Sequence, residues 1–105
     1  MALKRIPVRN DLPAYSMRIE LSGEIFALNF RYNQRSTRWI MDILTEDETP
    51  ILEGVLLRVD VPLLSQYFDE SLPEGDFIVL DRSNLGREPN RDNFGDELEL
   101  FYNEV

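Results

Sequence analysis

The sequence contains neither cysteine nor histidine among its 105 residues. Without cysteine the chain can form no disulfide, offers no thiolate nucleophile and cannot hold a cysteine-ligated zinc. Without histidine it also lacks the commonest general base and the commonest metal ligand. Most familiar catalytic sites are therefore excluded, and we expect no catalytic residues, no metal and no cofactor.

Carboxylates remain as a catalytic resource, because the chain has 20 Asp and Glu residues. Paired carboxylates can hydrolyse glycosides without histidine. Here, however, they cluster in the polar stretches 46–48 and 69–70, or alternate with apolar residues as Glu97 and Glu99 do. Carboxylates in such positions usually face water. We therefore predict that the chain is not an enzyme.

Long apolar runs are also missing. No segment approaches the roughly 18 apolar residues of a membrane span, and no signal-peptide pattern follows Met1. The length suits one domain, and the hydrophobic (43%) and charged (30%) fractions are those of a globular protein. We expect a single domain over residues 1–105 that is soluble, made in the cytoplasm and not bound to a membrane.

Lysine is scarce, since ten of the 11 basic residues are arginine and Lys4 is the exception. The formal net charge is −9, and it is unevenly spread: residues 1–40 sum to +4 and residues 41–105 to −13. This asymmetry either reflects which surfaces face water or directs unlike faces toward different neighbours. Arginine makes paired, directional hydrogen bonds and is enriched at interfaces, so the composition favours an assembly role.

Period-two alternation of apolar and polar residues dominates the middle of the chain, as in half-buried strands. Gly54 interrupts one such run and suggests a bulge or a close backbone approach. The pattern predicts an all-β fold, either a β-sandwich or a small β-barrel, of about six or more antiparallel strands. The predicted strands cover residues 15–21, 24–32, 38–44, 51–59, 76–81 and 97–102.

Four other segments complete the prediction. Residues 1–14 form a basic N-terminal arm that Pro7 and Pro13 keep extended. Residues 62–72 have apolar residues at helical spacing and predict one short helical segment. Residues 81–86 and 90–95 faintly resemble calcium loops, but each has an apolar residue in the fifth place, so we interpret them as turns.

The stretch RYNQRSTRWIMDI, residues 31–43, is the most distinctive part of the sequence. Its Tyr32 and Trp39 share the phase of buried positions, which leaves the arginines outside. A domain of charge −9 with one lysine would repel a phosphate backbone over most of its surface. We therefore expect Arg31, Arg35 and Arg38 to face protein carboxylates, and we add the acidic turn Glu46, Asp47 and Glu48 as a second candidate contact.

A further set of residues, spread from about Arg5 to Tyr102, makes a recognisable pattern of turns and apolar positions. They are Ser22-Gly23; Phe26, Leu28, Phe30 and Tyr32; Asn33 and Arg35; Trp39, Met41 and Ile43; Ile51, Gly54, Leu57, Leu63 and Leu64; Pro73, Gly75 and Asp81; and Leu98, Leu100 and Tyr102. In this pattern the chain resembles a family of small phage tail proteins typified by the baseplate plug of a contractile-tailed cyanophage.

The resemblance implies a structural protein of the virion, made in the host cytoplasm and placed at the tail baseplate. Such a protein would close or line the tail-tube lumen at the hub and contact the hub, the tube and the tape-measure protein. The symmetry of tail hubs makes a homotrimer plausible. The alternatives are another small tail-tip or virion-surface assembly protein and, less favoured by the charge, an oligonucleotide-binding β-barrel module.

Overall fold

The computed structural model describes residues 2–64, 67, 72–83 and 85–104, and all of their regular secondary structure is β-strand. Glycine or polar turn residues separate most of the strands, as the sequence pattern requires. The seven strands are β1 (Ala2–Ile6), β2 (Ala14–Leu21), β3 (Glu24–Asn33), β4 (Arg38–Thr45), β5 (Pro50–Leu56), β6 (Asp76–Asp81) and β7 (Leu98–Glu104).

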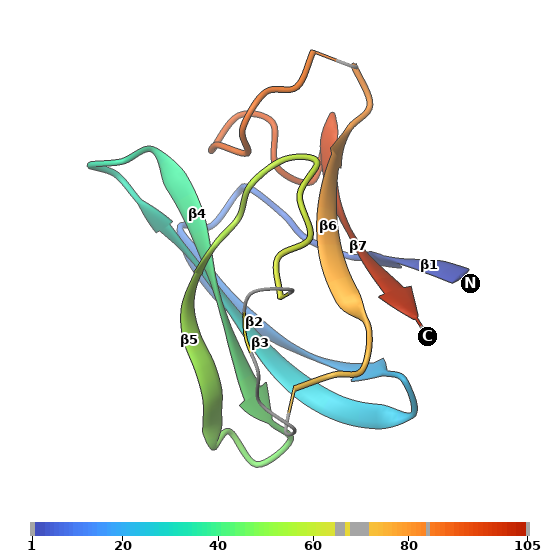
Figure 1. Ribbon diagram of the computed structural model, residues 1–105. Coiled ribbons are helices and arrows are strands. Elements are labelled where there is room, and N and C mark those ends of the chain that lie inside the picture. Colours follow the sequence, from blue (N-terminus) through green and yellow to red (C-terminus); the bar gives the residue numbers. More distant parts are fainter. Residues whose placement is uncertain (1, 65–66, 68–71, 84, 105) are drawn as a thin grey trace.

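The strands form two antiparallel sheets that face each other as a sandwich (Figure 1). One sheet is a four-stranded meander in the order β2-β3-β4-β5, and the other has three strands in the order β1-β7-β6. The β2–β3 hairpin turns at Ser22-Gly23, where both residues have positive φ, as tight hairpin turns need. The all-β prediction is confirmed, and of its two forms the sandwich is the one observed.

The core lies between the sheets and is built from the inward-facing residues of every strand. The predicted phases are confirmed on the central strands, because Phe26, Leu28 and Phe30 of β3 and Met41 of β4 are all buried. Aromatic rings fill one end of the core. Trp39 is completely buried and packs against the Phe94 ring with centroids 5.3 Å apart. Burial of rings of this size supplies a large share of the folding free energy.

Both sides of the sandwich are partly closed. After β5 the chain crosses to the other sheet, where Val59 bridges Val79 and the Leu63 amide donates to the Phe77 carbonyl at 3.0 Å. This crossing covers the outer edge of β6. On the opposite side, Lys4 of β1 donates to the Glu20 carbonyl of β2 at 2.6 Å. Sheet edges covered in this way are protected from pairing with other chains.

Several segments differ from the sequence-based expectation. The strand predicted over 51–59 ends at Leu56, because the chain then leaves the sheet for this crossing. The N-terminal arm is extended, but it is part of the sandwich: β1 pairs with β7, and Ile6 and Val8 are buried. Of the segment 62–72, residues 65–66 and 68–71 lie outside the described residues. The described part, 62–64, 67 and 72, is not helical.

No helix in the described part of the chain is long and apolar enough to span a bilayer.

Candidate functional site

The two predicted contact regions lie at opposite ends of the four-stranded sheet. The arginines surround the β3–β4 turn, whereas Glu46, Asp47 and Glu48 form the β4–β5 turn. The eight residues of β4 separate them, which at about 3.3 Å per residue is roughly 25 Å. The structure therefore does not bring the six candidate residues together but divides them into a basic and an acidic end.

The β3–β4 connection, residues 33–37, is an ordered turn that we call the basic turn. The Asn33 side-chain oxygen accepts hydrogen bonds from the backbone amides of Arg35 (2.9 Å) and Ser36 (3.3 Å). Thr37 has a φ of 55°, which completes the reversal into β4. An asparagine that bonds its own following backbone fixes a turn locally. Arg35 is thereby presented to solvent, as expected.

Arg31 has an exposed side chain, but it already has a carboxylate partner within the chain. Its guanidinium donates two hydrogen bonds to Asp42 on β4, at 3.1 and 3.3 Å. Asp42 is buried on the outer side of the sheet and also accepts the Gly54 amide at 2.8 Å, where β5 bulges. Of the two features expected at Gly54, the bulge is observed and the close backbone approach is not. Hydrogen bonding to Asp42 raises the pKa of Arg31, so its charge is permanent.

Arg38 differs from the expectation of an exposed contact residue. Only 23% of its side chain is accessible, and it makes an ion pair with Glu88 at 3.3 Å. It also donates to the Leu57 carbonyl at 3.1 Å, just after β5. The neighbouring Trp39 indole donates to the Asn90 carbonyl at 3.0 Å. Together these contacts attach the loop 87–93 to the sheet, so Arg38 supports the fold rather than facing outward.

Another cation, Arg91, joins the basic end. Its guanidinium carbon lies 5.7 Å from the centre of the half-buried Tyr32 ring, and its Nε donates to the Asn10 carbonyl at 3.1 Å. A cation over an aromatic face is attracted by the ring quadrupole. Arg91 was missed because it lies 54 positions after the end of the basic turn, and only the tertiary fold brings it there.

The β4–β5 turn is exposed, as predicted, and its order comes from Asp47. The hydroxyls of Thr45 and Thr49 donate to the Asp47 carboxylate, and these bonds lower the pKa of Asp47. Glu48 makes an ion pair with Arg18 of β2 at 3.2 Å, and the same arginine donates to the Glu46 carbonyl. Of the three acidic residues, Glu46 alone has a carboxylate without a partner among the described residues.

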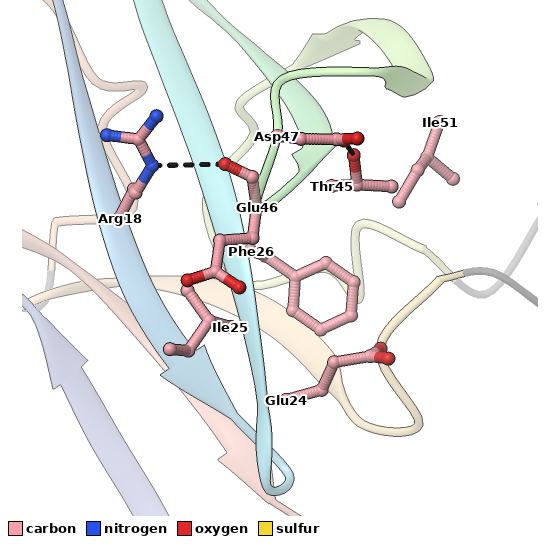
Figure 2. Close-up of a pocket in the computed structure, with 8 residues that line it drawn as sticks. All are labelled: Arg18, Glu24, Ile25, Phe26, Thr45, Glu46, Asp47 and Ile51. Carbon is pink, nitrogen blue, oxygen red and sulfur yellow. Dashed lines mark hydrogen bonds between the residues drawn. The ribbon is translucent and has the colours of Figure 1, made fainter.

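Beside this turn lies a groove of about 910 Å³, which we call the acidic groove (Figure 2). In Figure 2 the Phe26 ring lies between the carboxylates of Glu46 and Glu24. Ile25 adds an exposed apolar surface, with 41% of the residue accessible. Glu24 was missed because it opens a strand and carries no distinguishing motif. The lining residues are Arg18, Glu24, Ile25, Phe26, Thr45, Glu46, Asp47 and Ile51.

The described residues of the two calcium-like segments form turns, as predicted, and residue 84 lies outside the described residues. In the first, Asp81 accepts hydrogen bonds from the Ser83 amide (2.9 Å) and the Arg87 guanidinium (3.2 Å), and the Arg87 contact lowers the pKa of Asp81. In the second, Phe94 occupies the fifth place and is completely buried. Within the described ranges, no group of three or more Asp or Glu residues is placed to hold a metal ion.

Comparison with known proteins decides what kind of chain this is. No curated protein matches it. A family model described as "Cyanophage baseplate Pam3 plug gp18" matches residues 3–105, which is nearly the whole chain. The chain belongs to this baseplate plug family. The resemblance found in the sequence is thereby confirmed.

Membership of the baseplate plug family makes the chain a component of the phage tail that interacts with other tail proteins. A structural plug agrees with the expectation that the chain is not an enzyme. The matched residues 3–105 include both charged ends of the four-stranded sheet.

Proposed function

We propose that the chain closes or lines the lumen of the tail tube at the baseplate hub and contacts the hub, the tube and the tape-measure protein there. The observation that carries this proposal is the match to the baseplate plug family over residues 3–105. A homotrimer, in keeping with the symmetry of tail hubs, and synthesis in the host cytoplasm are parts of the same proposal.

The separation of charge along the four-stranded sheet supports this role. A plug lies between unlike neighbours, and a domain with a basic and an acidic end can bind different surfaces at each. Glu24, Glu46 and Glu48 gather at one end, whereas Arg31, Arg35 and Arg91 gather at the other. An acidic surface turned toward the lumen would repel the DNA backbone until the plug moves or is released.

Another small tail-tip or virion-surface protein is the nearest alternative. An oligonucleotide-binding module is less well supported, because it needs exposed aromatic platforms and free cations. Trp39 is completely buried, Arg38 is paired with Glu88, and Arg31 is paired with Asp42. A gel-shift assay with single-stranded DNA separates the two classes: salt-sensitive binding would favour the module, and no binding favours the plug.

The plug function is tested in the virion. Phage lacking this gene should produce tails without the chain, and a plasmid copy should restore both the protein and infectivity. Mass spectrometry of purified tails gives its copy number, for which we expect a multiple of three. Cryo-electron microscopy of the baseplate gives its position. Fully infectious particles without the chain, or density for it on the outside of the tail, would contradict the proposal.

A further inference from the structure

The acidic groove has the form of a docking site for a cationic, partly apolar segment. Its apolar lining residues are Ile25, Phe26 and Ile51, and of these Ile25 is exposed whereas Phe26 is buried. Glu24 and Glu46 stand at its rim, and within the described residues their carboxylates have no hydrogen-bonding or ion-pair partner. Arg18, the one cation in the lining, already donates to Glu48 and to the Glu46 carbonyl. The rim therefore keeps an excess of negative charge.

The basic turn has the complementary form. Arg35 is exposed, and no described carboxylate pairs with it. The turn that carries Arg35 is already held by the Asn33 side chain, so little order has to be imposed when it binds. Arginine combines a planar charged head with an apolar stem, and the stem can lie on Ile25 while the head reaches the carboxylates.

One chain cannot bring its own basic turn into its own groove, because β4 holds them roughly 25 Å apart. We propose that the basic turn of one copy binds in the acidic groove of a second copy, so that the chains associate head to tail. The contact brings the Arg35 guanidinium to the negatively charged rim of the neighbour's groove, which carries Glu24 and Glu46. An interface between two different patches is heterologous, and it forms a ring when its rotation closes.

The net charge of −9 opposes such association at long range. At about 0.1 M salt, however, charges more than about 10 Å apart are largely screened, whereas a guanidinium in contact with carboxylates is screened much less. The association should therefore be present at about 0.1 M salt and weaken as salt approaches about 1 M.

This inference deepens the proposed function, since it names the contact by which copies in the baseplate would meet. Its test uses the isolated chain, so its failure leaves the position of the protein in the tail unaffected. Loss of the proposed function, in turn, would be seen in virions and not in the association of purified protein.

Sedimentation velocity of the wild-type chain, from about 10 μM to about 1 mM, should show species larger than the 12.3 kDa monomer. Arg35→Glu reverses the charge of the basic turn, and Glu46→Lys reverses the charge at the groove rim. Each variant alone should therefore associate at least about tenfold more weakly than the wild type. The matched controls Arg58→Glu and Asp96→Lys make the same charge changes at exposed positions outside the basic turn and the groove, and they should associate like the wild type.

Mixing provides the decisive comparison. The Arg35→Glu variant keeps an intact groove and the Glu46→Lys variant keeps an intact turn, and their two altered patches also carry opposite charges. An equimolar mixture should therefore associate, although neither variant does so at wild-type strength alone. A chain carrying both substitutions restores complementary ends with exchanged signs, and should again associate beyond two copies. Circular dichroism confirms that each variant is folded.

Three results would overturn the proposal. The first is a wild-type chain that stays monomeric across the concentration range at about 0.1 M salt. The second is association of the two single variants at wild-type strength. The third is failure of both the mixture and the doubly exchanged chain to associate while both remain folded.

Discussion

Individual residues in this chain often have a structural partner where the sequence suggests a free surface. Arg38 is bound to Glu88, and Arg31 is bound to Asp42. Glu99, which alternates with apolar residues as an outward-facing strand position, is only 6% exposed. The prediction that Glu99 faces water is wrong, because Arg5 and Arg82 form ion pairs with its carboxylate. The alternation of apolar and polar residues predicts which face of the sheet a residue lies on. It does not predict which other side chains contact that face.

Arg35 lies in the basic turn and Arg38 directly follows it. Replacing Arg38 should change the stability of the fold far more than replacing Arg35. Arg38→Glu loses two contacts and places a carboxylate near Glu88, so it should lower the free energy of unfolding by about 2 kcal/mol. Arg35→Glu should change it by less than about 0.5 kcal/mol. Urea denaturation measures both, and equal destabilisation would contradict the assignment.

In phage, the Arg35→Glu variant tests the predicted partner surface. Arg35→Glu should block incorporation of a folded chain into the tail, because it reverses the charge of an exposed contact residue. Quantifying the protein in purified particles is the measurement. Normal incorporation of Arg35→Glu would remove the basic turn from the interface.

Gly75 is required for close packing rather than for backbone freedom. A Cβ at this position would lie 2.1 Å from the Asn103 carbonyl oxygen and 2.8 Å from the Tyr102 side chain. The clash is largely with backbone, so Gly75→Ala should reduce the free energy of unfolding by about 3 kcal/mol or more. Gly86→Ala is the control, because it has open space and only the strain of its positive φ, about 1 kcal/mol. Equal urea midpoints for the two variants would disprove the packing argument.

Among the elements, the strands of the central meander were predictable and the connections were not. The residues of β2, β3 and β4 alternate regularly, and short turns fix their pairing. By contrast, β1 pairs with β7, almost a hundred residues away, and the crossing after β5 leaves its sheet to cover β6. Such contacts depend on which sheet edge the rest of the fold leaves open. The local sequence of these segments does not predict that edge.

The same limit applies to the candidate site. The exposed turns at 33–37 and 46–48 follow from polar residues between alternating runs. Their placement at opposite ends of one sheet follows from the meander. Glu24 and Arg91 could not be predicted as residues of the two charged ends, because neither lies in a motif and only the tertiary fold places them there.

β1 is joined to the rest of its sheet by an ion-pair bridge as well as by its ladder. Glu99 of β7 accepts from Arg5 of β1 at 2.6 Å and from Arg82, after β6, at 2.7 Å. The Arg82 hydrogen bond, more than the Arg5 bond, lowers the pKa of Glu99 below its ordinary value of 4.5. The stability that the bridge contributes is therefore complete above pH 4.5 and is lost as pH falls through the lower, folded-state pKa.

A Glu99→Gln variant tests this pH dependence. Thermal unfolding should show the wild type more stable at neutral pH, and the difference should shrink as the pH falls below about 4.5. Other carboxylates titrate in the same range, but they do so in both proteins and drop out of the comparison. A difference that stays constant down to pH 2 or so would show that Glu99 acts through packing alone.

At the scale of the whole molecule, the division of charge between two ends is the property most directly linked to a plug. Replacing Glu46 and Glu48 with glutamine, while keeping Asp47 to hold the turn, removes two charges from the acidic end. If this end faces the lumen, phage carrying the variant should lose DNA earlier on mild heating, because less repulsion opposes its exit.

Nuclease-accessible DNA released over time is the measurement for these phage. Mass spectrometry of the particles checks that the variant is present in normal amount, which separates a lumen effect from failed assembly. The control Glu74→Gln with Asp92→Asn removes two exposed carboxylates outside this turn. DNA release identical to that of the wild type would show that the acidic end does not face the lumen.

The pairing of β1 with β7 has a practical consequence for locating the protein. Ala2 stands opposite Glu104 in the register, and Figure 1 shows both ends of the chain on the three-stranded side of the sandwich. The charged turns belong to the other sheet. A fluorophore or fusion partner attached at either end would therefore report on the position of the three-stranded sheet. Labels on the two ends would mark nearly the same point.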